Sequence, residues 1–342
     1  MDVELFNYNL PRHLIAQKPH LPRDLCKLLV YDRQNNTIKH RIFKDIVEYL
    51  SKGDLLILNN TKVIPARIIS HKRSGGAVEI FLLKKLGFNK YLCLTKGKIK
   101  EKTTVILKNS KKALIEKTNT DKRVVTFLET DDIKSHLIEI GDVPLPPYIK
   151  RDYSNYNKIE DYNNYQTVFA KEEGAIAAPT AGIHFTNRLL DSLKDKGVNI
   201  AYITLHVGIG TFRPVKTKTV EEHIMHEEYY SIDSKTAEIY NKTKLNGKRI
   251  VAVGTTTVRA LESSVKEDGL LIPQSKETNI FIYPGYKYKA IDAMITNFHL
   301  PKSTLLMMVS AFAGRDNILN CYKEAIKNSY RFFSFGDAML II

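Results

Sequence analysis

The chain has 342 residues, of which 43% are hydrophobic and 26% are charged, a composition typical of a folded soluble protein with about two domains. Its three cysteines, Cys26, Cys93 and Cys321, are odd in number and far apart, which excludes a disulfide framework and favours a reducing compartment. The N-terminus has no basic region followed by an apolar core, and the longest apolar stretch, within residues 305–313, is too short to cross a bilayer. We therefore expect a cytoplasmic protein.

Positive charge is the strongest signal in the composition. Lysine and arginine outnumber aspartate and glutamate by 52 to 37, a net charge of +15. A field of this sign favours a polyanionic partner such as nucleic acid or acidic lipid. A general lysine bias of the source proteome is the alternative explanation.

The first 64 residues predict one helix and two strands. An apolar run at 27–31 is followed by helical spacing of Ile42, Ile46 and Leu50, which predicts a helix over 41–50. Residues 55–58 predict a buried strand that leads into a polar loop. From residue 65 to 152, short apolar runs alternate with basic turns every 8–12 residues, which predicts an inserted all-β barrel closed by a proline-rich linker.

From residue 167 onward, strands alternate with helices. A helix at 187–197 ends at Gly197, and strands at 198–205, 248–254 and 292–298 alternate with helices in 255–265 and 303–314. This order is typical of α/β folds. Residues 1–64 and 153–342 are therefore predicted to form one discontinuous α/β domain around the β-barrel insertion at 65–152.

Two glycine turns follow predicted strands. In ITLHVGIGTF, Gly208 and Gly210 would allow a ligand to approach the backbone, but Arg213 stands where a dinucleotide fingerprint requires glycine; a tight strand-exit turn is the alternative. In VAVGTTTVRALES, Thr255, Thr256 and Arg259 could bind an anion or carboxylate at a helix N-terminus. A plain N-cap would also explain these threonines.

Two further blocks combine histidine with an aromatic residue. AAPTAGIHFT places His184 and Phe185 beside small residues, which could fit a nucleobase or could be core. ITNFHLPKST places Asn297, Phe298 and His299 at a strand end, where α/β sheets bind ligands.

The HIMHEE segment contains residue types that are common in metal sites, namely two histidines and two glutamates. Its order, HxxHE from His223, matches neither HExxH nor HxxEH, although the pair could share a helix face. A metal site, an acid–base or substrate contact, and a solvated helix face all remain open. In YRFFSFGDAMLII, Arg331 and Phe332 could hold a phosphate or stack on a base, or could belong to a core strand.

Together these blocks resemble the S-adenosylmethionine:tRNA ribosyltransferase-isomerase family of queuosine biosynthesis. The resemblance runs nearly end to end and rests on ten blocks in order: VIPAR, GGAVE, GDVPLPPYI, YQTVFA, AAPTAGIHFT, TLHVGIGTFRPV, HIMHEE, VGTTTVRALES, FIYPGYKYKAIDAMITNFHLPKSTLLMMVSAFAG and YRFFSFGDAML. It implies an α/β barrel-like domain in two sequence segments with an inserted β-barrel. One departure is Asn60, where the family pattern has aspartate before VIPAR; we expect that segment to bind tRNA or to be structural.

The resemblance also implies a reaction. The ribosyl part of S-adenosylmethionine is transferred to 7-aminomethyl-7-deazaguanine at the wobble position of a tRNA with a GUN anticodon, and isomerised to give epoxyqueuosine, adenine and methionine. It implies S-adenosylmethionine as substrate and no metal, and we expect no membrane partner and a monomer. A metal-dependent hydrolase built on His223 and His226, and a non-catalytic RNA-binding protein, are the rivals.

The implied reaction needs proton transfers that histidine could perform near neutral pH, and the candidates are His184, His206, His223, His226 and His299. In S-adenosylmethionine binding, Thr255, Thr256 and Arg259 would hold the carboxylate, and Glu228 or Glu262 would hold a cation. The full set of expected contacts is Pro179, Thr180, Gly182, Phe185, Gly208, Gly210, Thr211, Glu228, Thr255, Thr256, Arg259, Glu262, Asn297 and Phe298. The expected tRNA contacts are Asn59, Lys62, Arg67, Arg73, Lys84, Lys85, Arg331 and Phe332.

Overall fold

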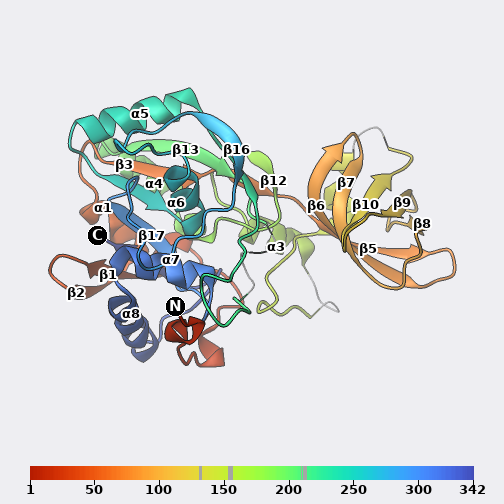
Figure 1. Ribbon diagram of the computed structural model, residues 1–342, viewed down its shortest axis with the longest axis horizontal. Helices are drawn as coiled ribbons and strands as arrows, with labels where there is room; N and C mark the ends of the chain where they lie inside the picture. The colour runs from red at the N-terminus through yellow and green to blue at the C-terminus, as the bar shows by residue number, and fades with distance from the viewer. Residues whose placement is uncertain (131–132, 153–156, 209, 211–213) are drawn as a thin grey trace.

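A computed structural model describes residues 1–130, 133–152, 157–208, 210 and 214–342 (Figure 1). Its main body is built on a nine-stranded mixed sheet. In spatial order the strands are β16 (Gln274–Thr278), β14 (Glu228–Ile232), β13 (Asn199–Leu205), β3 (Leu55–Asn59), β15 (Ile250–Val253), β17 (Ala293–Asn297), β18 (Ala338–Ile341), β1 (Lys27–Asp32) and β2 (Thr37–Ile42).

The centre of this sheet is parallel and its edges are antiparallel. Strand β3 pairs in parallel with β13 and β15, and β15 pairs in parallel with β17. Every residue of β3 is buried, as expected for a parallel strand covered on both faces. The described strands run from β16 at one edge to β2 at the other, so they form an open sheet and not the barrel-like domain that we expected.

Helices cover both faces of the sheet. Alternate residues of β3 point to opposite faces, with Leu55 and Ile57 in one core and Leu56 and Leu58 in the other. The first core is covered by α5 (Ser234–Leu245), α6 (Thr255–Glu262), α7 (Thr304–Ala313) and α8 (Arg315–Lys327). The second core is covered by α1 (Ile46–Tyr49) and α4 (Asn187–Asp195). Short 3₁₀ turns lie at η1 (Val3–Phe6), η2 (Arg12–Leu14), η3 (Arg23–Leu25), η4 (Phe43–Asp45) and η6 (Thr180–His184).

A closed six-stranded antiparallel barrel is inserted between β4 (Thr61–Val63) and β12 (Glu172–Ala175). Pairing of β5 with β8 closes it, and Figure 1 shows it projecting from one end of the main body. Its strands are β5 (Arg67–Lys72), β6 (Ala77–Gly87), β7 (Lys90–Lys96), β10 (Arg123–Phe127), β9 (Lys112–Lys117) and β8 (Lys102–Ile106). The segment that returns to the main body contains α2 (Ile133–Ile140), β11 (Gly141–Asp142) and α3 (Lys158–Asn164).

Strand pairing and an ion pair connect the barrel to the main body. Strands β4 and β12, one at each side of the insertion, pair in parallel. The Nζ of Lys84 on β6 also lies 2.6 Å from Oε1 of Glu277 on the edge strand β16. No described helix is long and apolar enough to cross a membrane.

Most sequence-predicted elements are confirmed, but the helix expected at 41–50 is largely wrong. Residues 37–42 form β2 against β1, and the helical part is only η4 followed by the four residues of α1. The apolar spacing of Ile42 and Ile46 reflects a strand end followed by a short turn.

Candidate active site

A cavity lies where strands of the main sheet end. Its volume is only about 40 Å³, below the roughly 300–1,000 Å³ of small-molecule sites, so a substrate would occupy it only in part. Its walls come from the carboxyl ends of β15 and β17 and from the segments that follow β12 and β13. This is the edge at which open α/β sheets bind ligands.

One wall of the cavity is the N-terminus of α6. Gly254 leaves β15 with a φ of 88°, a conformation that favours glycine, and turns the chain directly into the helix. Thr255 and Thr256 follow and line the cavity. The N–H groups of a first helical turn lack partners within the helix, so this wall suits an anion or carboxylate.

A second wall is formed by Thr180, Pro179 and Asn297. Oγ1 of Thr180 donates to Oδ1 of Asn297 at 2.9 Å. Phe298 also lines the cavity, but its side chain is fully buried against Tyr322 and Phe332, so its ring is core and not a stacking surface.

Two of the candidate catalytic histidines are buried and neutral. Burial lowers the pKa of His299 to about 3, and burial together with the charges of Arg331 and Arg23 lowers the pKa of His184 to about 3. His299 lines the cavity, with Nε2 2.7 Å from Oγ1 of Thr296. His184 lies behind the wall. Burial therefore argues against these two side chains titrating near neutral pH.

The other three histidines lie outside the cavity lining. His206 follows β13, with Nδ1 2.7 Å from Oγ1 of Thr61 and its ring stacked on Tyr229, and burial lowers its pKa. His223 and His226 lie in an irregular segment before β14, not on the helix face that we considered. His223 packs edge-on against Phe281, and its pKa is lowered by partial burial and then by His226.

Metal-ligand clusters can be assessed only for the part of the chain that is described. There, no group of three or more histidine, cysteine, aspartate or glutamate residues is arranged to hold a metal ion. His226 packs instead against the backbone of Gly210, where an added side chain would collide with its ring.

The charged residues expected to bind S-adenosylmethionine are engaged within the protein. Arg259 forms a buried ion pair with Glu228 and donates to the carbonyl oxygen of Thr278. Glu228 also accepts from the N–H of Gly208 at 2.7 Å. Glu262 accepts from Tyr286, and from the N–H groups of Lys289 and Ala290. These contacts account for the carboxylates without a ligand cation, whereas Nε of Arg259 is buried without a hydrogen-bond partner among the described residues.

Two other expected contacts, Phe185 and Gly182, do not line the cavity. Phe185 is fully buried against Phe43. A side chain at Gly182 would meet Phe169 at 2.8 Å, so this glycine serves packing. Thr211 lies outside the described residues.

The expected tRNA contacts divide into buried and accessible residues. Asn59 is buried and bonded to Leu205 and to Oγ1 of Thr256, and Phe332 is buried in the aromatic core. Neither can reach a large ligand. Arg73 is exposed in the β5–β6 turn, and Lys85 lines a separate hollow between the barrel and the main body. Lys62, Arg67 and Lys84 pair with Glu173, Glu79 and Glu277, respectively.

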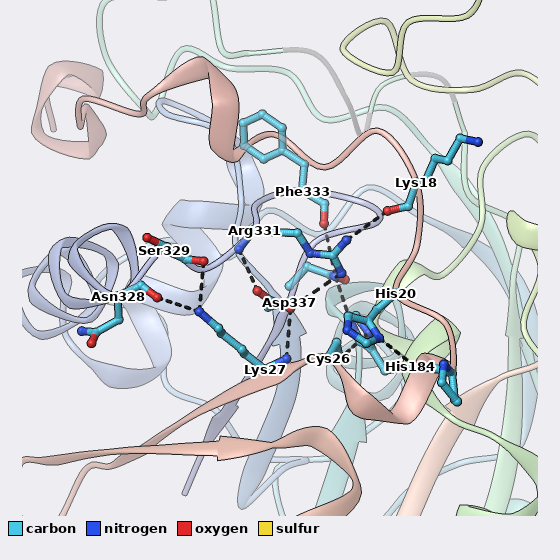
Figure 2. Close-up of polar contacts among 12 residues, drawn as sticks. Lys18, His20, Cys26, Lys27, His184, Asn328, Ser329, Arg331, Phe333 and Asp337 are labelled. Atoms are coloured by element: carbon cyan, nitrogen blue, oxygen red, sulfur yellow. Dashed lines mark hydrogen bonds and ion pairs between the residues drawn. The ribbon is translucent and has the colours of Figure 1, made fainter.

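Arg331 and Asn60 make specific contacts as well. Arg331 donates to the carbonyl oxygen of Lys18 and lies 3.8 Å from Asp337 (Figure 2). Oδ1 of Asn60, at the position of the family aspartate, accepts from Oγ1 of Thr204 at 2.7 Å. Asn60 therefore has a structural contact that an amide satisfies.

Several cavity residues were not among the candidates. Tyr148 comes from the proline-rich segment after the barrel and is bonded to Oγ of Ser334 at 2.7 Å. The remaining side chains of this group are mostly apolar; the lining includes Val207, Leu300, Leu305, Phe333 and Thr296. The sequence spacing of these residues does not predict a site, because they come from four segments that lie far apart in the sequence and meet only in the folded chain.

Comparison with known proteins places this geometry in a family. The family model described as "Queuosine biosynthesis protein" matches residues 3–341. The S-adenosylmethionine:tRNA ribosyltransferase-isomerase of Sulfurihydrogenibium sp. (strain YO3AOP1) is 52% identical over 100% of both chains. That of Caldanaerobacter subterraneus subsp. tengcongensis is 51% identical over 98% of both. The crystal structure of an S-adenosylmethionine tRNA ribosyltransferase from Thermotoga maritima is 38% identical with a TM-score of 0.56, covering 99% of this chain and 100% of that one. The chain belongs to the S-adenosylmethionine:tRNA ribosyltransferase-isomerase family of queuosine biosynthesis proteins.

Proposed function

We infer that this chain transfers the ribosyl moiety of S-adenosylmethionine onto 7-aminomethyl-7-deazaguanine at the tRNA wobble position and isomerises it. The products are epoxyqueuosine-tRNA, adenine and methionine. The observation that carries this inference is the full-length identity of 52% to a relative with that activity in its name. The cavity lies at the strand ends, where open α/β sheets bind ligands.

S-adenosylmethionine is proposed to lie in this cavity as the ribosyl donor, with no metal required. Its carboxylate would bind at the N-terminus of α6, where Thr255 and Thr256 offer hydroxyl groups and helix-terminal N–H groups. Arg259 would not hold it directly, since it is already paired with Glu228. Thr180 and Asn297 would contact the opposite side of the substrate.

The proton transfers require groups other than the two most buried histidines. An imidazole with a pKa of about 3 is a weak base at neutral pH. We propose that His206, His223 or His226 carries the proton between enzyme and substrate. His206 directly precedes Val207 of the cavity wall, and His223 and His226 lie in the same segment between β13 and β14.

The inserted barrel is proposed to bind tRNA phosphates. Residues 65–152, the proposed extent of the inserted domain between the segments 1–64 and 153–342, hold 19 of the 52 basic residues but 10 of the 37 acidic residues. This gives the insertion a net charge of +9 out of +15. Arg73 and Lys85 are accessible on it, and Lys62, Arg67, Lys84 and Arg331 would exchange carboxylate or carbonyl partners for phosphate.

The test uses the purified chain, S-adenosylmethionine and a tRNA carrying the aminomethyl-deazaguanine, with EDTA present. Released adenine and a nucleoside heavier by a dehydrated ribosyl unit are the expected products. Turnover that appears only when zinc is added would refute the metal-free reaction. Binding of tRNA without adenine release would indicate a non-catalytic RNA-binding protein. Sedimentation of the same sample tests the expected monomer.

A further inference from the structure

A line of buried polar side chains stands directly behind one cavity wall. Sγ of Cys26, just before β1, lies 3.2 Å from Nδ1 of His184, at the end of η6. Figure 2 shows these two side chains facing each other. Nε2 of His184 lies 3.0 Å from Nδ2 of Asn297, whose Oδ1 accepts from Thr180. Cys26, His184 and Asn297 are only 1%, 4% and 3% exposed, so water does not compete for these contacts.

The hydrogen-bond partners determine which atoms of these side chains carry the protons. Nδ2 of Asn297 also lies 3.3 Å from the backbone carbonyl oxygen of Phe333, which can only accept. The amide nitrogen must therefore face both Phe333 and His184. Because an NH₂ group can only donate, Nε2 of His184 must be unprotonated, and the neutral imidazole carries its proton on Nδ1. That N–H points at the sulfur of Cys26.

This polarity excludes a nucleophilic role for the thiol. A Cys–His nucleophile needs a histidine that accepts the thiol proton, whereas here the histidine donates toward the sulfur. Burial also holds the pKa of the Cys26 thiol well above its usual range, and Cys26 is not among the residues that line the cavity. The arrangement contains the residue types of a Cys–His–Asn triad, but His184 donates its proton towards Cys26, whereas in a triad the histidine accepts the proton of the thiol.

We propose that Cys26 and His184 are positioning residues that fix the amide of Asn297 in the cavity wall. Both N–H bonds of Asn297 are used within the protein, by His184 and by the backbone carbonyl of Phe333. Its Oδ1 has two lone pairs, of which Thr180 occupies one. Asn297 therefore presents an acceptor to the cavity, and the group it fits is a hydrogen-bond donor of the substrate, such as a hydroxyl or amino group. This inference rests on the proposed function of the same cavity.

Matched substitutions separate positioning from catalysis. His184→Gln keeps an oxygen acceptor near the Nε2 position, while His184→Leu removes it at similar volume. We expect His184→Leu to raise the KM for S-adenosylmethionine about tenfold, the effect of one misaligned hydrogen bond, and His184→Gln to recover most of the loss. Cys26→Ser should retain near wild-type KM, because a hydroxyl also accepts from Nδ1–H, and Cys26→Ala should not. Affinity for tRNA should stay within about twofold in all four variants.

A spectroscopic measurement on the unmodified enzyme guards against variants that fail to fold. ¹⁵N NMR of the histidine rings, with His184 assigned by its loss in His184→Gln, should show Nδ1 protonated and Nε2 bare from pH 6 to 8. Burial opposes protonation of this ring, and so do the charges of Arg331 and Arg23, while its other polar neighbours, Cys26 and Asn297, are uncharged. A protonated Nε2 would overturn the proposal.

Other outcomes are equally decisive. Unchanged KM in His184→Leu would refute positioning, and a Cys26→Ser enzyme as inactive as one alkylated at Cys26 would indicate a nucleophile instead. Failure of the proposed function is distinguishable, because it would leave the wild-type enzyme unable to release adenine while the ring tautomer remained as predicted.

Discussion

The buried ion pair between Arg259 and Glu228 makes a strong prediction about stability. Both side chains are 4% exposed, and they join the middle of α6 to the first residue of β14. Arg259→Met keeps the length and apolar stem of the side chain but removes its charge. Glu228 would then be a buried carboxylate that lacks its cation while it still accepts from the N–H of Gly208.

The expected cost follows from that geometry. Removing one partner of a buried pair typically destabilises a protein by about 3–5 kcal/mol, because the other charge stays buried. An unfolding entropy of about 2.1 cal/mol/K per residue makes each kcal/mol correspond to roughly 1.4 °C in Tm for a chain of 342 residues, so Arg259→Met should lower Tm by about 4–7 °C. The double variant Glu228→Gln/Arg259→Met removes both charges and keeps an acceptor for Gly208. It should recover more than half of the loss.

Urea unfolding of the wild type, both single variants and the double variant completes a thermodynamic cycle. Thr204→Val, which removes a half-buried hydroxyl that bonds Asn60, serves as the control for loss of one neutral hydrogen bond, at about 1 kcal/mol. The reasoning is refuted if Arg259→Met costs no more than this control. It is also refuted if the double variant is as unstable as the sum of the single ones.

Further predictions concern tRNA, pH, metal and the α6 threonines. Lys85→Ala should lower the slope of log K for tRNA against log salt by roughly 0.7–0.9, whereas exposed Lys323→Ala on α8 should leave it unchanged; equal slopes in both variants would contradict the barrel surface. The pKa of His299 is about 3 in the folded chain, against an ordinary value of 6.5. Between pH 3 and 6.5, this side chain therefore binds a proton only when the chain is unfolded. Stability should therefore fall as the pH drops from 6.5 towards 3, by up to about 1.4 kcal/mol per pH unit, and urea unfolding of His299→Gln at pH 7 and 5 should show a smaller loss. Prolonged dialysis against EDTA should leave the rate of adenine release unchanged, and a loss restored by zinc would overturn the metal-free reaction. Thr255→Val should raise the KM for S-adenosylmethionine by about fivefold or more, because it removes roughly one hydrogen bond, and it should not alter tRNA affinity. An unchanged KM would show that Thr255 does not contact the substrate.

Much of the fold could be predicted because its strands are short apolar runs with regular turns. The barrel strands β6 to β10 follow this pattern, but β5 was missed, since its inward residues include the polar Ser70, which is satisfied by the carbonyl of Val78. The open sheet was not predictable either, because its order depends on pairings such as β1 with β18, which are about 300 residues apart. Local patterns do not encode such partners.

Candidate site residues were predicted more reliably by their position than by their role. The ends of β15 and β17 do form the cavity, because strand ends in an α/β sheet converge. The internal partners of the charged side chains could not be predicted, since sequence spacing cannot reveal that Arg259 meets a carboxylate from β14 or that Glu262 caps the N–H groups of Lys289 and Ala290. In the same way, the pattern of AAPTAGIHFT does not show that His184 faces Cys26.

These internal pairings leave the cavity with an unusual electrostatic character. None of its described lining residues is an aspartate, glutamate, lysine or arginine, and the histidine among them, His299, is neutral. The donor substrate of the proposed reaction carries a sulfonium cation, and a wall of hydroxyls, amide and apolar groups provides no counter-ion to neutralise it. Electrostatic effects are stronger where the surroundings are apolar, so the sulfonium charge acts mainly on its own neighbouring C–H bonds. A neutral wall held rigid by buried ion pairs and hydrogen bonds would therefore favour loss of a proton beside sulfur, which is the step that ribosyl transfer from S-adenosylmethionine requires.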